Sequence, residues 1–186
     1  MRVSREQAAR NRERVVDVAG ELFRAKGFDG IGVADLMHAA GLTHGGFYGS
    51  FASKEALEVE ASRHALDGTA AFVRKLAAES DDPLEAIVRF YLSPEHRDAI
   101  GAGCAIAALS QDAVRGSAAL RGVFEAAIRD YLSLLAELVP GETKAARFKR
   151  SMVTYSTMVG ALQLARAVND PKLSDAILEA AVEALT

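Results

Sequence analysis

The residues best suited to chemistry lie in one short stretch, residues 41–54. Thr43 carries a hydroxyl, and His44 carries an imidazole that can reach a base edge or a phosphate. A hydroxyl beside the free N–H groups of a helix N-terminus suits a phosphate oxygen. Gly45 and Gly46 have no side chains, so the backbone there can approach another molecule closely. The alternatives are a simple helix cap at Thr43, a surface histidine without a role, and a tight turn at the glycines.

Two predicted helices must position this stretch. Residues 33–40 have helical apolar spacing, and Gly41 ends that helix. A second helix of about two turns begins at Thr43, whose hydroxyl can cap it. So short a helix is not stable alone, but Phe47 and Phe51 stand four residues apart and can anchor one face in the core. A short helix presented by another helix and a tight turn is typical of a helix-turn-helix that reads a DNA major groove.

The rest of the chain also follows helical spacing. Local signals for helix ends include Ser4, Gly27, Ser53 and Pro83. The polar residues 95–98 are left outside any helix, and no stretch has the alternation of a strand. We predict an all-α fold of about nine helices, over residues 5–26, 33–40, two turns from 43, 54–79, 83–92, 104–109 with a possible extension to 114, 117–139, 142–168 and 172–185.

Charge is unevenly distributed along the 186 residues. The net charge is −3, with +2 in residues 1–54 and −5 in residues 55–186. Five arginines fall in the first 14 residues: Arg2, Arg5, Arg10, Arg12 and Arg14. A solvated tail is the default interpretation of these arginines, and Arg5 and Arg14 are weak candidates for a DNA contact. A mildly basic N-terminal part on an acidic body fits a protein in which one face meets phosphates.

Other kinds of site have little support. Cys104 is the single cysteine, which excludes an intrachain disulfide, and its apolar neighbours favour a small buried residue over a nucleophile or redox sensor. The four histidines show no metal-ligand spacing, so we expect no metal, no cofactor and no enzymatic activity. The sequence lacks a signal peptide and an apolar run long enough to span a bilayer, so we expect a cytoplasmic protein that does not enter membranes.

Several motifs in fixed order resemble the tetracycline-repressor-like (TetR/AcrR-type) family of transcription regulators. Residues 23–27 read Phe-Arg-Ala-Lys-Gly, residues 40–41 read Ala-Gly, residues 45–51 read Gly-Gly-Phe-Tyr-Gly-Ser-Phe, and residues 53–55 read Ser-Lys-Glu. The resemblance covers roughly residues 10–58. Two positions depart from the pattern: Ser50 stands where many members have histidine, and Gly32 stands where a threonine cap is common.

The resemblance implies a division of labour along the chain. Residues 1–53 would form a three-helix DNA-binding domain, and residues 54–186 a larger helical domain for effector binding and dimerisation. It places the Tyr48 hydroxyl and the Lys54 ammonium on DNA phosphates, beside Thr43, His44, Gly45 and Gly46.

Bulky apolar residues of the second domain could line an effector cavity, although an ordinary core is the alternative for each of them. The candidates are Phe72, Phe90, Phe124, Tyr131, Tyr155 and Met158. Their chemistry favours a neutral, moderately hydrophobic small molecule.

The last two helices carry small and apolar residues that suit close helix packing. In the resembling family these helices form a four-helix dimer interface. The candidates here are Thr157, Gly160, Ala161, Leu173, Ile177 and Ala181. A two-fold dimer would bind a near-palindromic operator in double-stranded DNA.

We therefore expect a homodimeric transcription regulator, most simply a repressor released from its operator by a small hydrophobic ligand. Two alternatives remain open. One is a helical ligand-binding protein with weakened or lost DNA recognition, suggested by Ser50 and the modest basic charge. The other is a small-molecule enzyme that uses Cys104.

Overall fold

The computed structural model describes residues 4–186, and all regular elements in that range are helices. In chain order they are α1 (Arg5–Lys26), α2 (Val33–Ala39), the 3₁₀ helix η1 (His44–Gly49), α3 (Lys54–Ala78), α4 (Pro83–Tyr91), α5 (Pro94–Asp98), α6 (Ala105–Arg115), α7 (Ala118–Leu138), α8 (Lys144–Ala167) and α9 (Pro171–Leu185). The predicted all-α class and most predicted helix bounds are confirmed.

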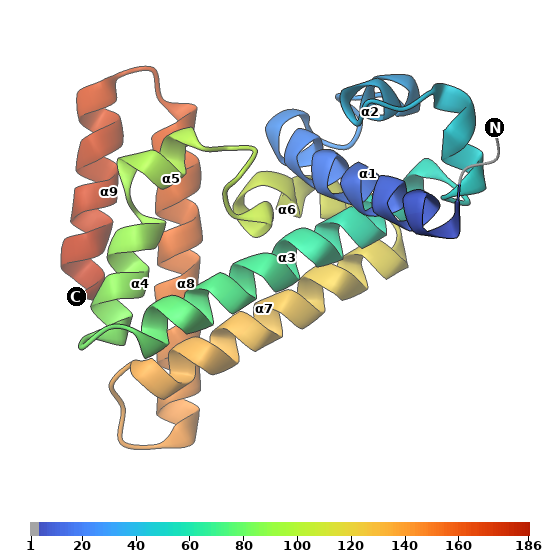
Figure 1. The fold of residues 1–186 in the computed structure, drawn as a ribbon. Coiled ribbons are helices and arrows are strands. Elements are labelled where there is room, and N and C mark those ends of the chain that lie inside the picture. Colours follow the sequence, from blue (N-terminus) through green and yellow to red (C-terminus); the bar gives the residue numbers. More distant parts are fainter. Residues whose placement is uncertain (1–3) are drawn as a thin grey trace.

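The first helices form a head at one end of the molecule (Figure 1). α1 begins where the Ser4 side chain accepts a hydrogen bond from the Gln7 N–H at 3.1 Å. It ends at Gly27, whose φ of +76° favours glycine. α1 packs against α3, and α2 packs against both α1 and η1. The predicted helix-turn-helix is therefore present, and the first part of α3 supports it.

The second helix of the helix-turn-helix differs from the prediction. It is a 3₁₀ helix whose i→i+3 hydrogen bonds include Gly46 N–H to the Thr43 carbonyl, and the Thr43 side chain makes no capping hydrogen bond. Two glycines at its start lower the preference for a regular α-helix. Tertiary packing holds it instead, because Phe47 and Phe51 are almost fully buried, as predicted.

The body is organised around two long helices. α3 and α7 run side by side and in the same direction away from the head (Figure 1). At the far end α8 and α9 pack against each other, with α4 against both. The short helix α6 is central: it contacts α1 of the head as well as α3, α7 and α8. The helix α6 therefore connects the head with the body.

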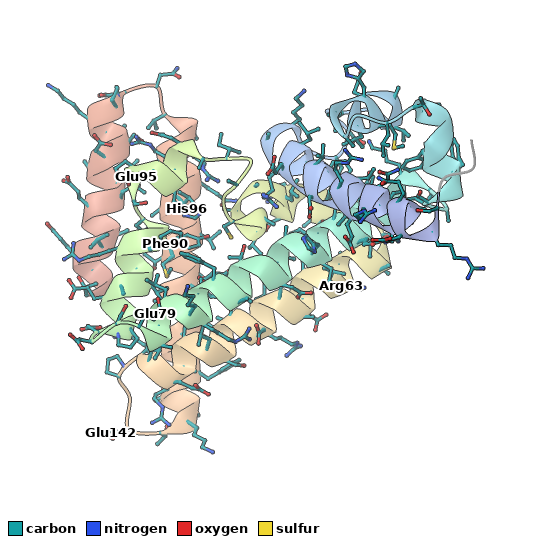
Figure 2. The ribbon with its side chains drawn as sticks, viewed as in Figure 1. Arg63, Glu79, Phe90, Glu95, His96 and Glu142 are labelled. Atoms are coloured by element: carbon teal, nitrogen blue, oxygen red, sulfur yellow. The ribbon has the colours of Figure 1, made fainter. Side chains whose placement is uncertain are left out.

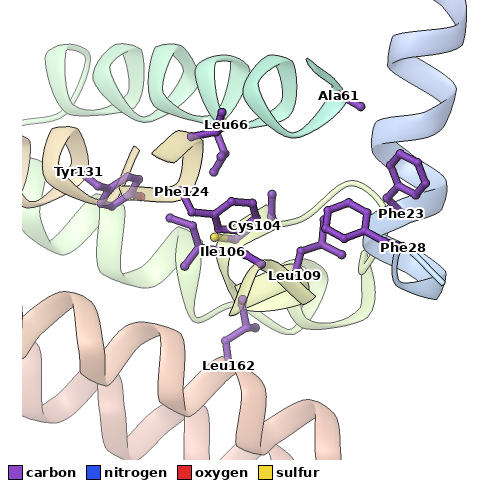
Figure 3. Packing of buried hydrophobic residues seen from close by; sticks show 14 of the residues in the cluster. Phe23, Phe28, Ala61, Leu66, Cys104, Ile106, Leu109, Phe124, Tyr131 and Leu162 are labelled. Carbon is purple, nitrogen blue, oxygen red and sulfur yellow. The ribbon is translucent and has the colours of Figure 1, made fainter. Parts of the chain in front are cut away.

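One apolar core continues from the head into the body. Phe23 and Phe28 meet edge to face with ring centroids 5.0 Å apart, and Figure 3 shows them beside Leu109 of α6. Leu66 of α3 and Leu162 of α8 continue the cluster on either side of α6. Each buried side chain of this size contributes about 1.5–3 kcal/mol, so the position of α6 is well determined by packing.

The segment before α6 differs from the prediction in one respect. Residues 94–98 form the short helix α5, which begins where the Ser93 side chain accepts from the His96 N–H at 3.1 Å. Pro94 suits the first helical position, a signal that the polar composition of this segment obscured. No helix within residues 4–186 has the length and apolarity needed to cross a bilayer.

Candidate functional site

The outer face of η1 is exposed and polar. Thr43, His44, Gly45 and Gly46 are all exposed, and Tyr48 is 69% exposed. The rings of His44 and Tyr48 pack edge to face with centroids 6.2 Å apart. Five of the six predicted DNA-contact residues are therefore exposed at η1, and two of them, His44 and Tyr48, contact each other.

The two glycines of η1 do not owe their presence to local backbone strain. Neither has a positive φ. A side chain at Gly45 would meet no other atom within 4 Å, and one at Gly46 would make ordinary contact with Met37 at 3.6 Å. A tight turn therefore does not explain the two glycines. The other interpretation, an open backbone surface that another molecule can approach, is retained.

Lys54 is partly used inside the chain. Its ammonium donates to the Phe28 carbonyl and lies 3.7 Å from a Glu58 carboxylate oxygen. Burial raises the pKa of Glu58, while Lys54 opposes that rise. Lys54 thus ties the loop after α1 to the start of α3, a role that its sequence position did not reveal.

The early arginines are also engaged in part. Arg12 pairs with Glu60 and lies over the Phe51 ring, with its guanidinium carbon 4.8 Å from the ring centroid. Arg14 donates to Asn11 at 2.7 Å, and Arg5 is exposed. Arg2 lies outside the described residues. Arg12 therefore fixes α1 on α3 beside η1.

Two cavities open between the helices of the body. The larger of the two, about 540 Å³, lies among α3, α6, α7 and α8. The smaller, about 390 Å³, lies among α1, α3, α4, α5, α7 and the start of α6. Thr69, Cys104 and Tyr131 line both cavities. The two spaces are thus neighbours that share three lining residues.

Four of the six predicted ligand-binding residues line these cavities. Phe72 and Phe90 line the smaller cavity, where their rings lie 4.8 Å apart, and Tyr155 joins Tyr131 in the larger one. Phe124 and Met158 do not line either cavity. Both are buried side chains of the core, because helical spacing alone does not distinguish a core position from a cavity wall.

His96 braces the wall of the smaller cavity. Its Nδ1 lies 2.6 Å from the Tyr91 carbonyl oxygen, and its Nε2 lies 3.0 Å from the Cys104 nitrogen. Because a carbonyl only accepts and an N–H only donates, Nδ1 carries the proton and Nε2 accepts. Burial lowers the pKa of His96, against the effect of the Tyr91 carbonyl. Figure 2 shows His96 close to Phe90, whose ring stacks on the imidazole at 5.8 Å.

Cys104 is buried, as predicted, but it is more than a packed core residue. It begins α6 and contributes to both cavities. Arg24, on α1, lines the smaller cavity as well. No sequence signal connected these residues, which lie far apart in the chain. Within residues 4–186, no three His, Cys, Asp or Glu side chains gather as they would around a metal ion.

The predicted dimer residues fall into two groups. Leu173 is 49% exposed, and Thr157, Gly160 and Ile177 are partly exposed. Ala161 and Ala181 are buried within the single chain, so they cannot offer free surface.

Exposed apolar side chains extend this face along α8. Val153 is 56% exposed and Leu164 is 61% exposed. Together with Thr157 and Gly160 they have the spacing of one helix face. A side chain at Gly160 would meet no atom of this chain within 4 Å. Helical spacing in the sequence places Val153 and Leu164 on the same face as Thr157 and Gly160, although they were not among the predicted dimer residues.

The chain was compared with known protein families and structures. A sequence model described as "Bacterial regulatory proteins, tetR family" matches residues 15–61, which span α1, α2, η1 and the start of α3. No curated protein is similar enough in sequence to match.

Solved structures share the fold along nearly the whole chain. A TetR transcriptional regulator from Chloroflexus aurantiacus J-10-FL is 25% identical, with a TM-score of 0.81 over 97% of this chain and 94% of that one. A TetR-family transcriptional regulator from Agrobacterium tumefaciens is 19% identical, with a TM-score of 0.80 over 96% and 99%. AibR, in complex with isovaleryl coenzyme A and operator DNA, is 15% identical, with a TM-score of 0.67 over 94% and 97%.

The structure has a helix-turn-helix with exposed polar residues and a helical body with cavities. The comparisons with known proteins agree with both features. This combination supports a DNA-binding transcriptional regulator. Residues 15–61 thus match the sequence model of the tetR family of bacterial regulatory proteins, and the chain as a whole shares the fold of solved TetR-family transcriptional regulators.

Proposed function

We propose that this protein is a homodimeric transcriptional repressor that a small molecule releases from operator DNA. The observation that carries the proposal is the two-sided character of η1. Phe47 and Phe51 bury one side in the core, while the side chains of Thr43, His44 and Tyr48 are exposed on the other. We assign residues 1–53 to DNA binding and residues 54–186 to effector binding and dimerisation. Such a protein works in the cytoplasm, where operator DNA is found.

Each exposed residue of η1 has a role in the proposed complex. The Thr43 and Tyr48 hydroxyls donate to phosphate oxygens, which set affinity and register. His44 reaches a base edge, which contributes sequence choice. Gly45 and Gly46 let the backbone approach the groove. Lys54 adds a positive charge next to the phosphates while it holds the Phe28 carbonyl.

We propose that α8 and α9 form the dimer interface. Val153, Leu164 and Leu173 expose apolar surface there, and Gly160 leaves room for a partner helix. Burial of such surface drives association. A two-fold dimer presents two copies of η1 to successive major-groove faces, so the operator is near-palindromic.

Release follows from a shift between two conformations. In one conformation of the dimer the two heads are spaced to fit the operator, and in the other they are not. An effector that binds only the second conformation lowers the affinity for the operator, by an amount set by the difference between its affinities for the two conformations. The structure of AibR in complex with isovaleryl coenzyme A and operator DNA supports small-molecule binding and DNA binding by one protein of this fold. The contacts of α6 with α1, α3, α7 and α8 supply a physical connection.

A gel-shift titration with the DNA that flanks its own gene tests the proposal. We expect a salt-sensitive shift, because phosphate contacts release counterions. The second candidate is a helical ligand-binding protein that has lost DNA recognition, which Ser50 and the engaged Lys54 ammonium favour. Absence of any salt-sensitive shift, together with retained small-molecule binding, would select that candidate. Proteins of this fold are described as regulators, which are usually not enzymes, so an activity at Cys104 is not proposed.

A further inference from the structure

Three tyrosine hydroxyls are buried near Cys104 without a hydrogen-bond partner. They belong to Tyr91 on α4, Tyr131 on α7 and Tyr155 on α8, and each residue is at most 5% exposed. Burial raises the pKa of all three phenols, and the nearby Cys104 thiol raises it further. They therefore stay protonated and remain hydrogen-bond donors. The thiol lies close to the Tyr91 and Tyr155 hydroxyls, but sulfur is a weak acceptor and the geometry is not that of a hydrogen bond. Because unpartnered buried hydroxyls cost free energy, three at one place indicate an acceptor that is not part of the chain.

The N-terminus of α6 lies at the same place. Cys104 is the N-cap residue, and its side chain makes no capping hydrogen bond. The residues of the first turn, Ala105, Ile106 and Ala107, are all at most 7% exposed. The N–H groups of a first helical turn carry partial positive charge. Figure 3 shows Cys104 and Ile106 at this end of α6, with the Tyr131 ring reaching toward them from α7.

The charge around the junction of the two cavities is positive on the side of the smaller cavity. Arg24 lines the smaller cavity, and none of the residues that line it is acidic. Burial lowers the pKa of Arg24 although the nearby Glu21 carboxylate opposes that change, and within residues 4–186 Arg24 forms no ion pair at 4.0 Å or less. The larger cavity is lined by Arg63 and by two carboxylates, Asp67 and Asp130, of which Asp130 is paired with Arg74 at 2.5 Å. The junction of the cavities thus offers donors and positive potential.

We propose that this junction binds the carboxylate of a small organic acid. The hydroxyls of Tyr91, Tyr131 and Tyr155 donate to the carboxylate oxygens beside the N-terminus of α6. The apolar body of the acid lies in the larger cavity, against Leu66 and Ile106. The inference deepens the proposed function and rests on it for the effector role, and it replaces the neutral ligand expected from the sequence with an acidic one.

The chain holds its own control for a test of this site. It has four tyrosines, of which three meet at the junction while Tyr48 is exposed in the head. Tyr→Phe substitution removes only the hydroxyl. At the junction it deletes an unpartnered donor, so the ligand-free protein should unfold at the same or a higher temperature. A merely structural hydroxyl would show no effect on ligand affinity.

Calorimetric titration of the full chain, without DNA, compares octanoate with octanamide and phenylacetate with phenylacetamide. We expect at least one acid to bind about tenfold or more tightly than its amide, because charge-assisted hydrogen bonds are the stronger ones. Tyr131→Phe and Tyr155→Phe should each weaken binding of that acid about fivefold or more, whereas Tyr48→Phe should leave it unchanged.

Three results would overturn the inference: equal affinity for acid and amide, equal affinity of the junction variants and the wild type, or no binding of either acid at millimolar concentration. The proposed function fails separately. If acids bind at the junction but the gel-shift titration shows no operator binding, the ligand site is supported and the regulator role is rejected.

Discussion

Arg24 Nε donates a 2.6 Å hydrogen bond to the carbonyl oxygen of Gly101, 77 residues further along the chain. Arg24 belongs to α1 of the head, and Gly101 belongs to the segment that leads into α6. The approach is close: a side chain at Gly101 would lie 3.3 Å from the Glu21 carbonyl oxygen. The head is thus fastened directly to the wall of the smaller cavity, so a ligand there can change the position of α1.

Replacement of Arg24 should weaken this connection. We expect Arg24→Gln to lower the free energy of unfolding by about 1.5–3 kcal/mol, the usual value for a hydrogen bond to a charged group. It should also reduce the change in operator affinity that a bound acid causes. Denaturant unfolding and gel shifts with and without octanoate measure the two effects. Arg115→Gln, an exposed arginine on α6, is the control, and an equal effect of both variants would contradict the link.

A substitution at Gly160 can test dimer formation without disturbing the packing of the single chain. Because its outer side is open within the chain, Gly160→Leu should fold and keep its helix content, but it should shift the dimer toward monomer by obstructing a partner helix. Size exclusion with light scattering measures the mass. Gly122→Leu on α7 is the control, since that glycine is also open but lies at the larger cavity and not on the α8 face. A dimer that persists equally in both variants would exclude Gly160 from the interface.

Lys54 should affect both stability and DNA binding. Lys54→Gln removes the charged donor to the Phe28 carbonyl, so we expect unfolding to become easier by about 1–2 kcal/mol. If the ammonium also contacts a phosphate, the slope of log affinity against log salt should fall by about one. Lys75→Gln, at the exposed end of the same helix, should change neither quantity. If the Lys54→Gln variant keeps the wild-type slope of log affinity against log salt, Lys54 has only a structural role.

His96 should make the protein less stable in acid. Its folded-state pKa is lowered, mainly by burial, so below about pH 6.5, the usual value for histidine, the unfolded chain binds more protons than the folded one. The free energy of unfolding therefore falls as the pH drops from about 6.5 toward the folded pKa. Urea unfolding between pH 5 and pH 8 should show this slope, and His96→Asn should flatten it. An unchanged slope in the variant would assign the acid sensitivity to other groups.

The sequence predicted those parts of the fold that depend on local signals. Ser4, Ser53 and Pro83 mark helix starts in the structure as expected, and the four-residue spacing of Phe47 and Phe51 correctly predicts their burial. Such features depend on residues within a few positions of one another, which spacing and composition describe directly.

The features that the sequence did not predict depend on distant contacts. Arg24 meets Gly101, and Cys104 lies near three tyrosines from different helices, only because of how α1, α4, α7 and α8 pack around α6. The same reason explains Phe124, which is a core residue although its type and spacing fit a cavity wall equally well.

Operator binding by η1 is the central claim, and fluorescence anisotropy with labelled DNA from the flanks of the gene tests it most directly. Wild-type protein should bind with a steep salt dependence, and His44→Ala and Tyr48→Phe should each bind about tenfold more weakly, equivalent to about 1.4 kcal/mol, with unchanged unfolding temperatures because both side chains are exposed. Binding that is independent of salt, or equal in the wild type and both variants, would contradict the claim.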